Sequence, residues 1–202
     1  MTSATTPAST QREPELAGQT VVVIGGSAGV GLETARRACA EGADVILTGR
    51  NPDRLKQAAL ELGAQRTAAF DASDAASLQR FFQDLPAPID HVMVTAGGPH
   101  YGPLLKMDSV QVRQAISDHV VLALEVAPVR VNLIAAGFVD TPLSASLLGD
   151  RLEERRNELR ATLPIGRVVG PADVAALTVH IMTNTALTGA TDDIDGGQQF
   201  VS

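Results

Sequence analysis

The chain has 202 residues, of which 45% are hydrophobic and 19% charged, a composition that suits one globular domain with a sizeable core. Its formal net charge of −7 argues against nucleic acid or an anionic membrane surface as a partner, because both require a basic face. The single cysteine, Cys39, excludes an internal disulfide and a C-x-x-C metal site. We therefore expect no metal, no membrane segment and a reducing, cytoplasmic setting.

The first 18 residues are rich in Thr, Ser, Ala, Pro and Glu, and they have neither the basic start nor the apolar middle of a secretory signal. We expect a disordered lead-in over residues 1–18 and one folded domain over residues 19–202.

From residue 20 onward, short β-branched runs alternate with helical patterns. The first half predicts strands over Thr20–Ile24, Asp44–Thr48, Gln65–Phe70 and His91–Val94, and helices over Leu32–Glu41, Asn51–Leu62 and Ser73–Leu85, the last with Ser73 as its N-cap. The second half predicts a helix from Asp108 or Ser109 to about Ala127, a strand over Val129–Ala135, a flap or exposed helix pair over Pro142–Leu163, a helix over Pro171–Thr183 and a strand over Thr191–Ile194. This alternation predicts an α/β fold with a doubly wound, Rossmann-like parallel sheet of about six strands.

A glycine-rich segment, Gly25 to Gly31, lies between the first strand and the first helix. Glycines let the backbone turn tightly and approach a pyrophosphate, while the N–H groups at the start of the helix face the phosphate charge. A tight turn without a ligand is the alternative, which the position on the first strand disfavours. The residues expected to contact a cofactor here are Gly25, Ser27, Ala28, Gly29, Val30 and Gly31.

Several motifs in the same order resemble the short-chain dehydrogenase/reductase family over residues 17–201. The spacing Gly25-x-x-x-Gly29-x-Gly31 is similar to that family's phosphate loop, with Ile24 in the place of its threonine. Other matches are Asp71 after the third strand, Thr95-Ala96-Gly97 after the fourth, Arg130-Val131-Asn132, the stretch Gly137 to Pro142 that follows Ala136 in the place of a proline, and Thr188-Gly189 with Asp193 to Gly197 near the end. The resemblance implies an oxidoreductase with further cofactor contacts from Asp71, Ala72, Ala96, Gly97, Val139 and Thr141.

The end of the second strand indicates which nicotinamide cofactor is preferred. An acidic residue about 20 positions past the glycines usually binds the ribose 2′-hydroxyl of NAD. Here the segment reads Thr48-Gly49-Arg50-Asn51, and Asp53 lies in the turn that starts the next helix. The Arg50 guanidinium can pair with a 2′-phosphate, so we expect NADP rather than NAD, although a solvated arginine is the alternative.

The catalytic residues that the resemblance implies are missing. The family uses a serine and a Tyr-x-x-x-Lys pair, whereas this chain has one tyrosine, Tyr101, and two lysines, Lys56 and Lys106. Gly102 and Pro103 separate Tyr101 from Lys106, so no helix face carries both. The predicted helix that ends at Ala127 reads as two joined halves, which indicates that a strand–helix unit is absent.

Three residues remain as weak acid–base candidates: His100, Tyr101 and His119. His100 and Tyr101 follow the fourth strand at the carboxyl edge, and His119 falls near the place of a family asparagine. Ordinary loop or helix polarity is the favoured alternative for each.

The absence of a complete strand–helix unit also affects the expected sheet. It predicts direct pairing of the fourth and fifth strands and the spatial order 3-2-1-4-5-6.

Three hypotheses stay open. The chain is an NADP(H)-dependent oxidoreductase that acts on a small-molecule substrate and has lost a segment, a pseudoenzyme that binds NADP(H) without turnover, or a non-functional deletion product. In the family, the missing or merged helices often form a dimer face, so the resemblance leaves the oligomeric state open, and the dimer face of a homo-oligomer would be altered.

Overall fold

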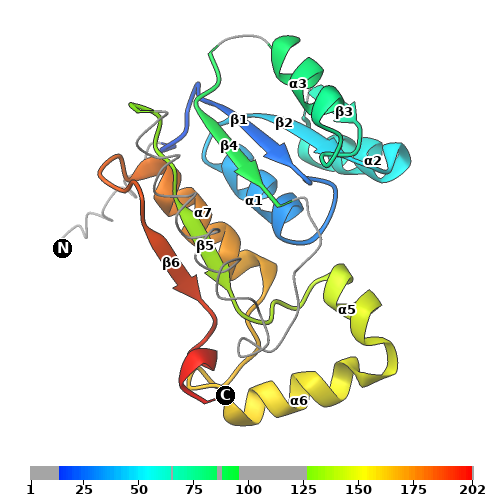
Figure 1. Ribbon diagram of the computed structural model, residues 1–202, viewed down its shortest axis with the longest axis vertical. Helices are drawn as coiled ribbons and strands as arrows, with labels where there is room; N and C mark the ends of the chain where they lie inside the picture. Colours follow the sequence, from blue (N-terminus) through cyan, green and yellow to red (C-terminus); the bar gives the residue numbers. More distant parts are fainter. Residues whose placement is uncertain (1–13, 65, 86–87, 96–126, 202) are drawn as a thin grey trace, which may run out of the picture.

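The protein was analysed as a computed structural model, which describes residues 14–64, 66–85, 88–95 and 127–201. Its strands are β1 (Thr20–Ile24), β2 (Asp44–Gly49), β3 (Arg66–Ala69), β4 (His91–Val94), β5 (Leu133–Ala136) and β6 (Thr191–Ile194). Its helices are α1 (Gly29–Ala40), α2 (Pro52–Leu62), α3 (Ala75–Gln83), α5 (Pro142–Leu148), α6 (Leu152–Thr162) and α7 (Pro171–Thr183), with 3₁₀ turns η2 (Gly149–Arg151) and η3 (Gln198–Phe200). The predicted α/β fold with parallel strands is confirmed (Figure 1).

The first four strands form one parallel sheet in the order β3-β2-β1-β4. β1 lies inside it and alternates between two cores, since neighbouring side chains of a strand point to opposite faces. Val21 and Val23 pack with α1, α2 and α7, whereas Val22 and Ile24 pack with α3 through Phe81. This two-sided burial explains why β1 reads as a continuous apolar run in the sequence. Because the four strands are parallel, their carboxyl ends meet at one edge of the sheet.

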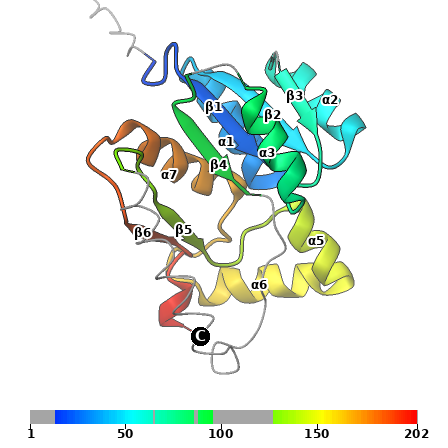
Figure 2. The same cartoon turned by 45° about the horizontal axis from the view of Figure 1, so that its top comes forward.

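The predicted pairing of the fourth strand with the fifth is wrong. β5 pairs with β6 in a separate two-stranded parallel sheet, with Ile134 opposite Asp192, and β4 pairs only with β1 among the described strands. Figures 1 and 2 both show β5 and β6 beside α7 rather than against β4. The predicted order therefore holds as two separate parts, 3-2-1-4 and 5-6.

Contacts of α7 explain this separation. α7 packs along α1, and its Val179 and Met182 belong to the same core as Val21 and Val23 of β1. The chain before β5 is bound to the C-terminal end of α7, and to the turn after it, by Arg130, which donates four hydrogen bonds to backbone carbonyls. Arg130 therefore holds the chain before β5 next to α7, which itself packs on α1.

Several predicted boundaries need correction. α1 starts at Gly29 rather than Leu32, because the last turn of the glycine loop is already helical. The N-cap of α3 is Asp74, whose carboxylate accepts the N–H of Ala76, and not Ser73, which donates to Asp71 instead. The fifth strand covers Leu133–Ala136 instead of residues 129–135, because the segment before it is committed to α7.

The segment after β5 forms an arm of two helices, α5 and α6, joined by η2, which agrees with the helix pair that was one of the two alternatives for this segment (Figure 2). The end of this arm is fixed by two glycines that follow β6. A Cβ at Gly197 would lie 2.6 Å from Pro164, and one at Gly196 would lie 2.8 Å from Ile165. None of the helices in the described ranges has the length and apolar character needed to cross a membrane.

Candidate cofactor site

The glycine loop leaves β1 at a sharp turn over the end of β2. The N–H groups of Gly25 and Gly26 both donate to the carbonyl of Thr48, at 3.2 and 2.9 Å. Gly25 has a φ of +95°, a backbone conformation that residues other than glycine rarely adopt. A Cβ at Gly26 would lie 2.7 Å from Leu47, so the loop can follow this path only with glycine at both positions.

Thr95, directly after β4, holds the loop from the other side. Its N–H donates to the carbonyl of Ile24 at 2.8 Å, and its hydroxyl lies 3.2 Å from the carbonyl oxygens of Ile24 and Gly25. A Cβ at Gly31 would lie 2.3 Å from the Gly25 carbonyl and 2.7 Å from the Thr95 hydroxyl. Gly31 therefore allows α1 to pack directly against the loop.

The start of α1 fits an anionic ligand. The N-cap residue, Ala28, is extended and offers no side-chain hydrogen bond, and the first turn contains no acidic residue. The first N–H groups of a helix have no partner within the helix, and the helix dipole places partial positive charge there. With Gly29 at a φ of +57°, these donors lie next to the glycine loop, as a pyrophosphate would require.

Arg50 and Asp71 lie at the ends of neighbouring strands. Gly49 pairs with Ala69 in the β2–β3 ladder, and the N–H of Phe70 donates to the Gly49 carbonyl at 3.2 Å. Arg50 is exposed and makes no hydrogen bond or ion pair within the described part of the chain. The room beside Gly49 holds the side chain of Ser27, whose hydroxyl would lie 2.9 Å from a Cβ there.

Asp71 is oriented by Ser73. Its Oδ1 accepts both the Ser73 hydroxyl, at 2.7 Å, and the Ser73 N–H, at 3.0 Å. These two bonds, and to a smaller degree the charge of Arg50, lower the pKa of the Asp71 carboxyl, which therefore stays ionised. The second oxygen, Oδ2, accepts no hydrogen bond from the residues that the structure describes, so it can accept one from a ligand.

The stretch after β5 reaches the glycine loop from the other sheet. The Cβ of Thr141 would lie 3.5 Å from a Cβ at Gly29, so the two residues are in contact distance. Thr141 begins α5 through a reciprocal capping box with Ser144: its hydroxyl accepts the Ser144 N–H at 3.2 Å, and its own N–H donates to the Ser144 hydroxyl at 2.8 Å. Val139 forms a parallel bridge with Val169.

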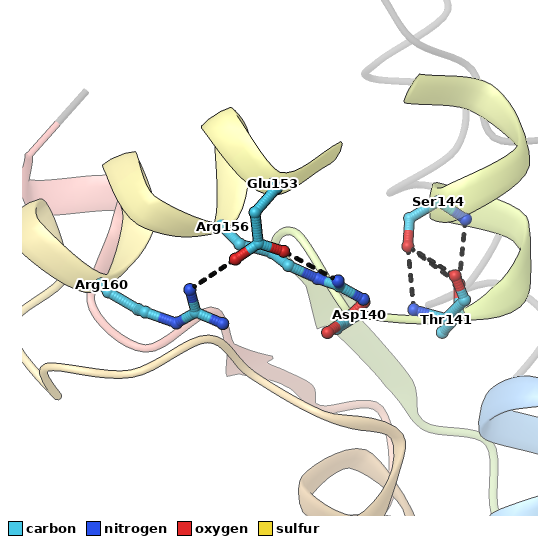
Figure 3. Close-up of polar contacts among 6 residues, drawn as sticks. All are labelled: Asp140, Thr141, Ser144, Glu153, Arg156 and Arg160. Carbon is cyan, nitrogen blue, oxygen red and sulfur yellow. Dashed lines mark hydrogen bonds and ion pairs between the residues drawn. The ribbon is translucent and has the colours of Figure 1, made fainter. Parts of the chain in front are cut away.

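A network of charges connects α6 to this stretch (Figure 3). Nη2 of Arg156 lies 2.7 Å from Oδ1 of Asp140, and its Nη1 lies 3.1 Å from Glu153. Glu153 also pairs with Arg160 at 3.0 Å. Hydrogen bonds to the two carboxylates, that of Asp140 first, raise the pKa of the Arg156 guanidinium further. Sequence reasoning missed this network because its long-range pair joins residues 16 positions apart on different elements.

Two of the motifs in the family resemblance have structural roles. Nη1 of Arg130 donates to the carbonyls of Ile181, Asn184 and Leu187, and Nη2 to that of Met182, all at 2.8–3.0 Å. The carbonyls of Ile181 and Met182 lie at the C-terminal end of α7, where a cation is stabilising, and those of Asn184 and Leu187 lie in the turn that follows. In the other motif, Asp195 accepts the N–H groups of Gly197 and Gln199, which lowers its pKa and fixes the turn after β6.

The remaining expected residues are placed as follows. Ala28, Val30 and Ala72 lie beside Gly29 and Asp71 on the same edge, whereas Ala96, Gly97, His100, Tyr101 and His119 lie outside the described residues. A hollow of about 240 Å³ opens at the carboxyl ends of β5 and β6, beside Gly137 and Asp195. A larger groove of about 680 Å³ lies between β3 and α3 and is lined by none of the expected residues. Neither hollow is lined by the glycine loop, which carries the candidate cofactor site.

A parallel sheet with a glycine loop leading into a helix at its carboxyl edge defines a Rossmann-like dinucleotide-binding fold. The chain belongs to the short-chain dehydrogenase family of oxidoreductases, which bind a nicotinamide cofactor: the short chain dehydrogenase profile matches residues 19–120. A second profile, described as Enoyl-(Acyl carrier protein) reductase, matches residues 119–199.

Individual relatives extend over the whole domain. A short-chain dehydrogenase/reductase of Stachybotrys chlorohalonatus is 23% identical over 91% of this chain and 98% of its own. An NADP-dependent (R)-specific alcohol dehydrogenase of Lentilactobacillus kefiri is 26% identical over 90% and 97%. The MalC reductase/Diels-Alderase of Malbranchea aurantiaca has the same fold, with a TM-score of 0.78, 21% identity, and coverage of 93% of this chain and 99% of its own.

The lengths of these alignments show that the relatives have internal residues that this chain lacks. The alignment with the Stachybotrys protein has 252 positions, more than the 202 residues of this chain, and still reaches nearly both ends of the relative. The relative therefore contains residues inside the aligned region for which this chain has no counterpart.

Proposed function

We propose that this chain binds NADP(H) at the edge formed by the glycine loop, Arg50, Asp71 and the Val139–Thr141 stretch, and that its own oxidoreductase chemistry is impaired. The observation that carries the cofactor preference is Arg50, an exposed guanidinium at the end of β2 where an NAD enzyme would present a carboxylate. A 2′-phosphate beside Arg50 would form charge-assisted hydrogen bonds, and an acid in that position would repel it.

The geometry of Asp71 supports the same assignment. Asp71 lies at the end of the strand next to Arg50, is kept ionised by Ser73 and has a free oxygen toward solvent among the described contacts. A carboxylate there can accept from an adenine or ribose group without occupying the place of the 2′-phosphate. The Lentilactobacillus relative, described as NADP-dependent, adds support for the choice of cofactor.

The chemical step lacks its usual acid. The nicotinamide would supply or accept a hydride, and a carbonyl substrate would also need a proton as its oxygen gains charge. In the family a tyrosine with a lysine one helical turn later provides this proton, and the only tyrosine here is Tyr101, without such a lysine. His100 and Tyr101 are the remaining proton donors close to that edge in the sequence.

A second candidate function follows from the same observation. A chain that keeps the loop, Arg50 and Asp71 but lacks the proton donor can bind NADP(H) as a sensor or partner protein without turnover. Replacing Tyr101 by Phe and His100 by Ala separates the two. Turnover that either substitution abolishes supports a relocated acid, and absence of turnover in the unmodified protein supports binding alone.

The test of cofactor preference is a fluorescence titration of the purified protein with NADPH and NADH. We expect NADPH to bind more tightly, and the substitution Arg50→Ala to narrow the preference by about tenfold or more, since hydrogen bonds to charged groups contribute ~1.5–3 kcal/mol. Arg54→Ala, which removes an exposed arginine from the first turn of α2, is the matched control and should leave the preference unchanged. Equal affinities in the unmodified protein, or tighter binding of NADH, would contradict the assignment.

A further inference from the structure

The arm formed by α5 and α6 is fastened at two places. Its far end is fixed by close packing, where Pro164 and Ile165 lie against the glycines after β6. Between that end and α5, one long-range ion pair joins α6 to the rest of the molecule among the described residues, the contact of Arg156 with Asp140. The other ion pairs of α6, such as Arg155 with Glu158, are internal to the helix.

The ion pair acts on a segment that borders the proposed site. Asp140 directly precedes Thr141, and its N–H donates to the carbonyl of Val169 at 3.0 Å. Both partners are partly shielded, with side chains 27% and 31% exposed, so solvent screens the pair less than a fully exposed one. Arg156 therefore fixes the residue from which Thr141 extends toward Gly29.

The layout of the site gives this segment a particular part of the ligand. The strand order places Arg50 and Asp71 on the β2–β3 side of the glycine loop, whereas Thr141 approaches Gly29 from the side of β5. A dinucleotide with its 2′-phosphate at Arg50 and its pyrophosphate at the loop must extend its second nucleoside toward Thr141. The adenosine half stays on the other side of the loop.

We propose that Arg156 is a positioning residue, which through its ion pair with Asp140 holds the Asp140–Thr141 segment in place for the nicotinamide half of the cofactor. This inference rests on the proposed function. It assigns to a residue of the arm a role in binding one half of the ligand, without contact between Arg156 and the ligand itself.

The experiment compares two probes, NADPH and adenosine 2′,5′-bisphosphate, which lacks the nicotinamide half. The substitution Arg156→Gln should weaken NADPH binding about two- to fivefold, the range for a partly exposed ion pair, and leave the bisphosphate unaffected. Because both probes bind the same folded fraction, the ratio of their affinities does not depend on any loss of stability. Arg155→Gln, which breaks a pair internal to α6, is the matched control and should leave the ratio unchanged.

A double-mutant cycle with Asp140→Asn attributes the effect to the pair. If the pair carries it, the double variant should resemble either single variant rather than show the product of two losses. An unchanged ratio in Arg156→Gln, or additive losses in the double variant, would overturn the inference. Failure of the unmodified protein to bind the bisphosphate would contradict the proposed function, and with it the inference.

Discussion

At the scale of single residues, the site depends on positions where no side chain fits. Gly31 is the tightest of them, since a Cβ there would lie within 2.3 Å of the Gly25 carbonyl and 2.7 Å of the Thr95 hydroxyl. Neither atom can move away easily, because the first belongs to the backbone and the second is hydrogen-bonded to the carbonyls of Ile24 and Gly25. The close packing of the start of α1 on the glycine loop therefore requires glycine at position 31.

The substitution Gly31→Ala should destabilise the protein by ~1–3 kcal/mol, the usual cost of forcing an extra carbon into a packed site, and should also weaken NADPH binding. Gly170→Ala is the matched control, because a Cβ there would meet only Asp173 at 3.8 Å, an ordinary contact. Urea unfolding, followed by far-UV circular dichroism because the chain contains no tryptophan, measures the difference in stability between the two variants. Equal stability of the two variants would contradict the packing described for the loop.

Sequence reasoning could predict the glycine loop but not the role of Arg130. The glycines follow a strand at fixed spacing, so their function is written in neighbouring residues. The partners of Arg130 are backbone carbonyls at Ile181 to Leu187, more than 50 positions away, and a backbone carbonyl leaves no trace in residue identity. The pair of Arg156 with Asp140 was missed for a different reason, since both are charged side chains but they lie 16 positions apart on different elements.

At the scale of elements, the unexpected feature is the division of the sheet. Hydrophobic periodicity predicted the existence of every described strand, but it does not state which strand pairs with which. The order 3-2-1-4-5-6 assumed that β5 would move next to β4, whereas the contacts of α7 with α1 and Arg130 fix β5 elsewhere. α7 contacts both parts of the molecule, α1 through packing and the chain before β5 through Arg130.

Hydrogen exchange should distinguish the two sheets. The amides of β1 lie between two paired strands and are buried, so they should exchange only when the whole domain opens. Those of β5 and β6 belong to a two-stranded sheet and should exchange about tenfold or more faster, through local opening. Mass spectrometry of peptides from both regions measures this, and equal protection of β5 and β1 would show that the division is absent in solution.

At the scale of the whole molecule, this chain has the outline of its family without part of its interior. The match to the MalC structure covers 99% of that protein's chain. The sequence alignment with malC has 250 positions, whereas this chain has only 202 residues. The residues that we propose for the adenosine and pyrophosphate groups follow β1, β2 and β3, which are all present, whereas the sequence contains no match to the Tyr-x-x-x-Lys pair that the family uses. Cofactor binding and catalysis should therefore separate in this protein.

The most direct measurement of that separation is the fate of NADPH bound to the purified chain. The protein is saturated with NADPH, mixed with a panel of ketones, quinones and enoyl thioesters, and the absorbance of the reduced nicotinamide is followed. We predict saturable binding together with oxidation no faster than that of free NADPH, since positioned acid catalysis alone contributes ~10²–10⁴-fold to such reactions. Multiple-turnover oxidation of NADPH that persists in Tyr101→Phe and His100→Ala variants would contradict this account.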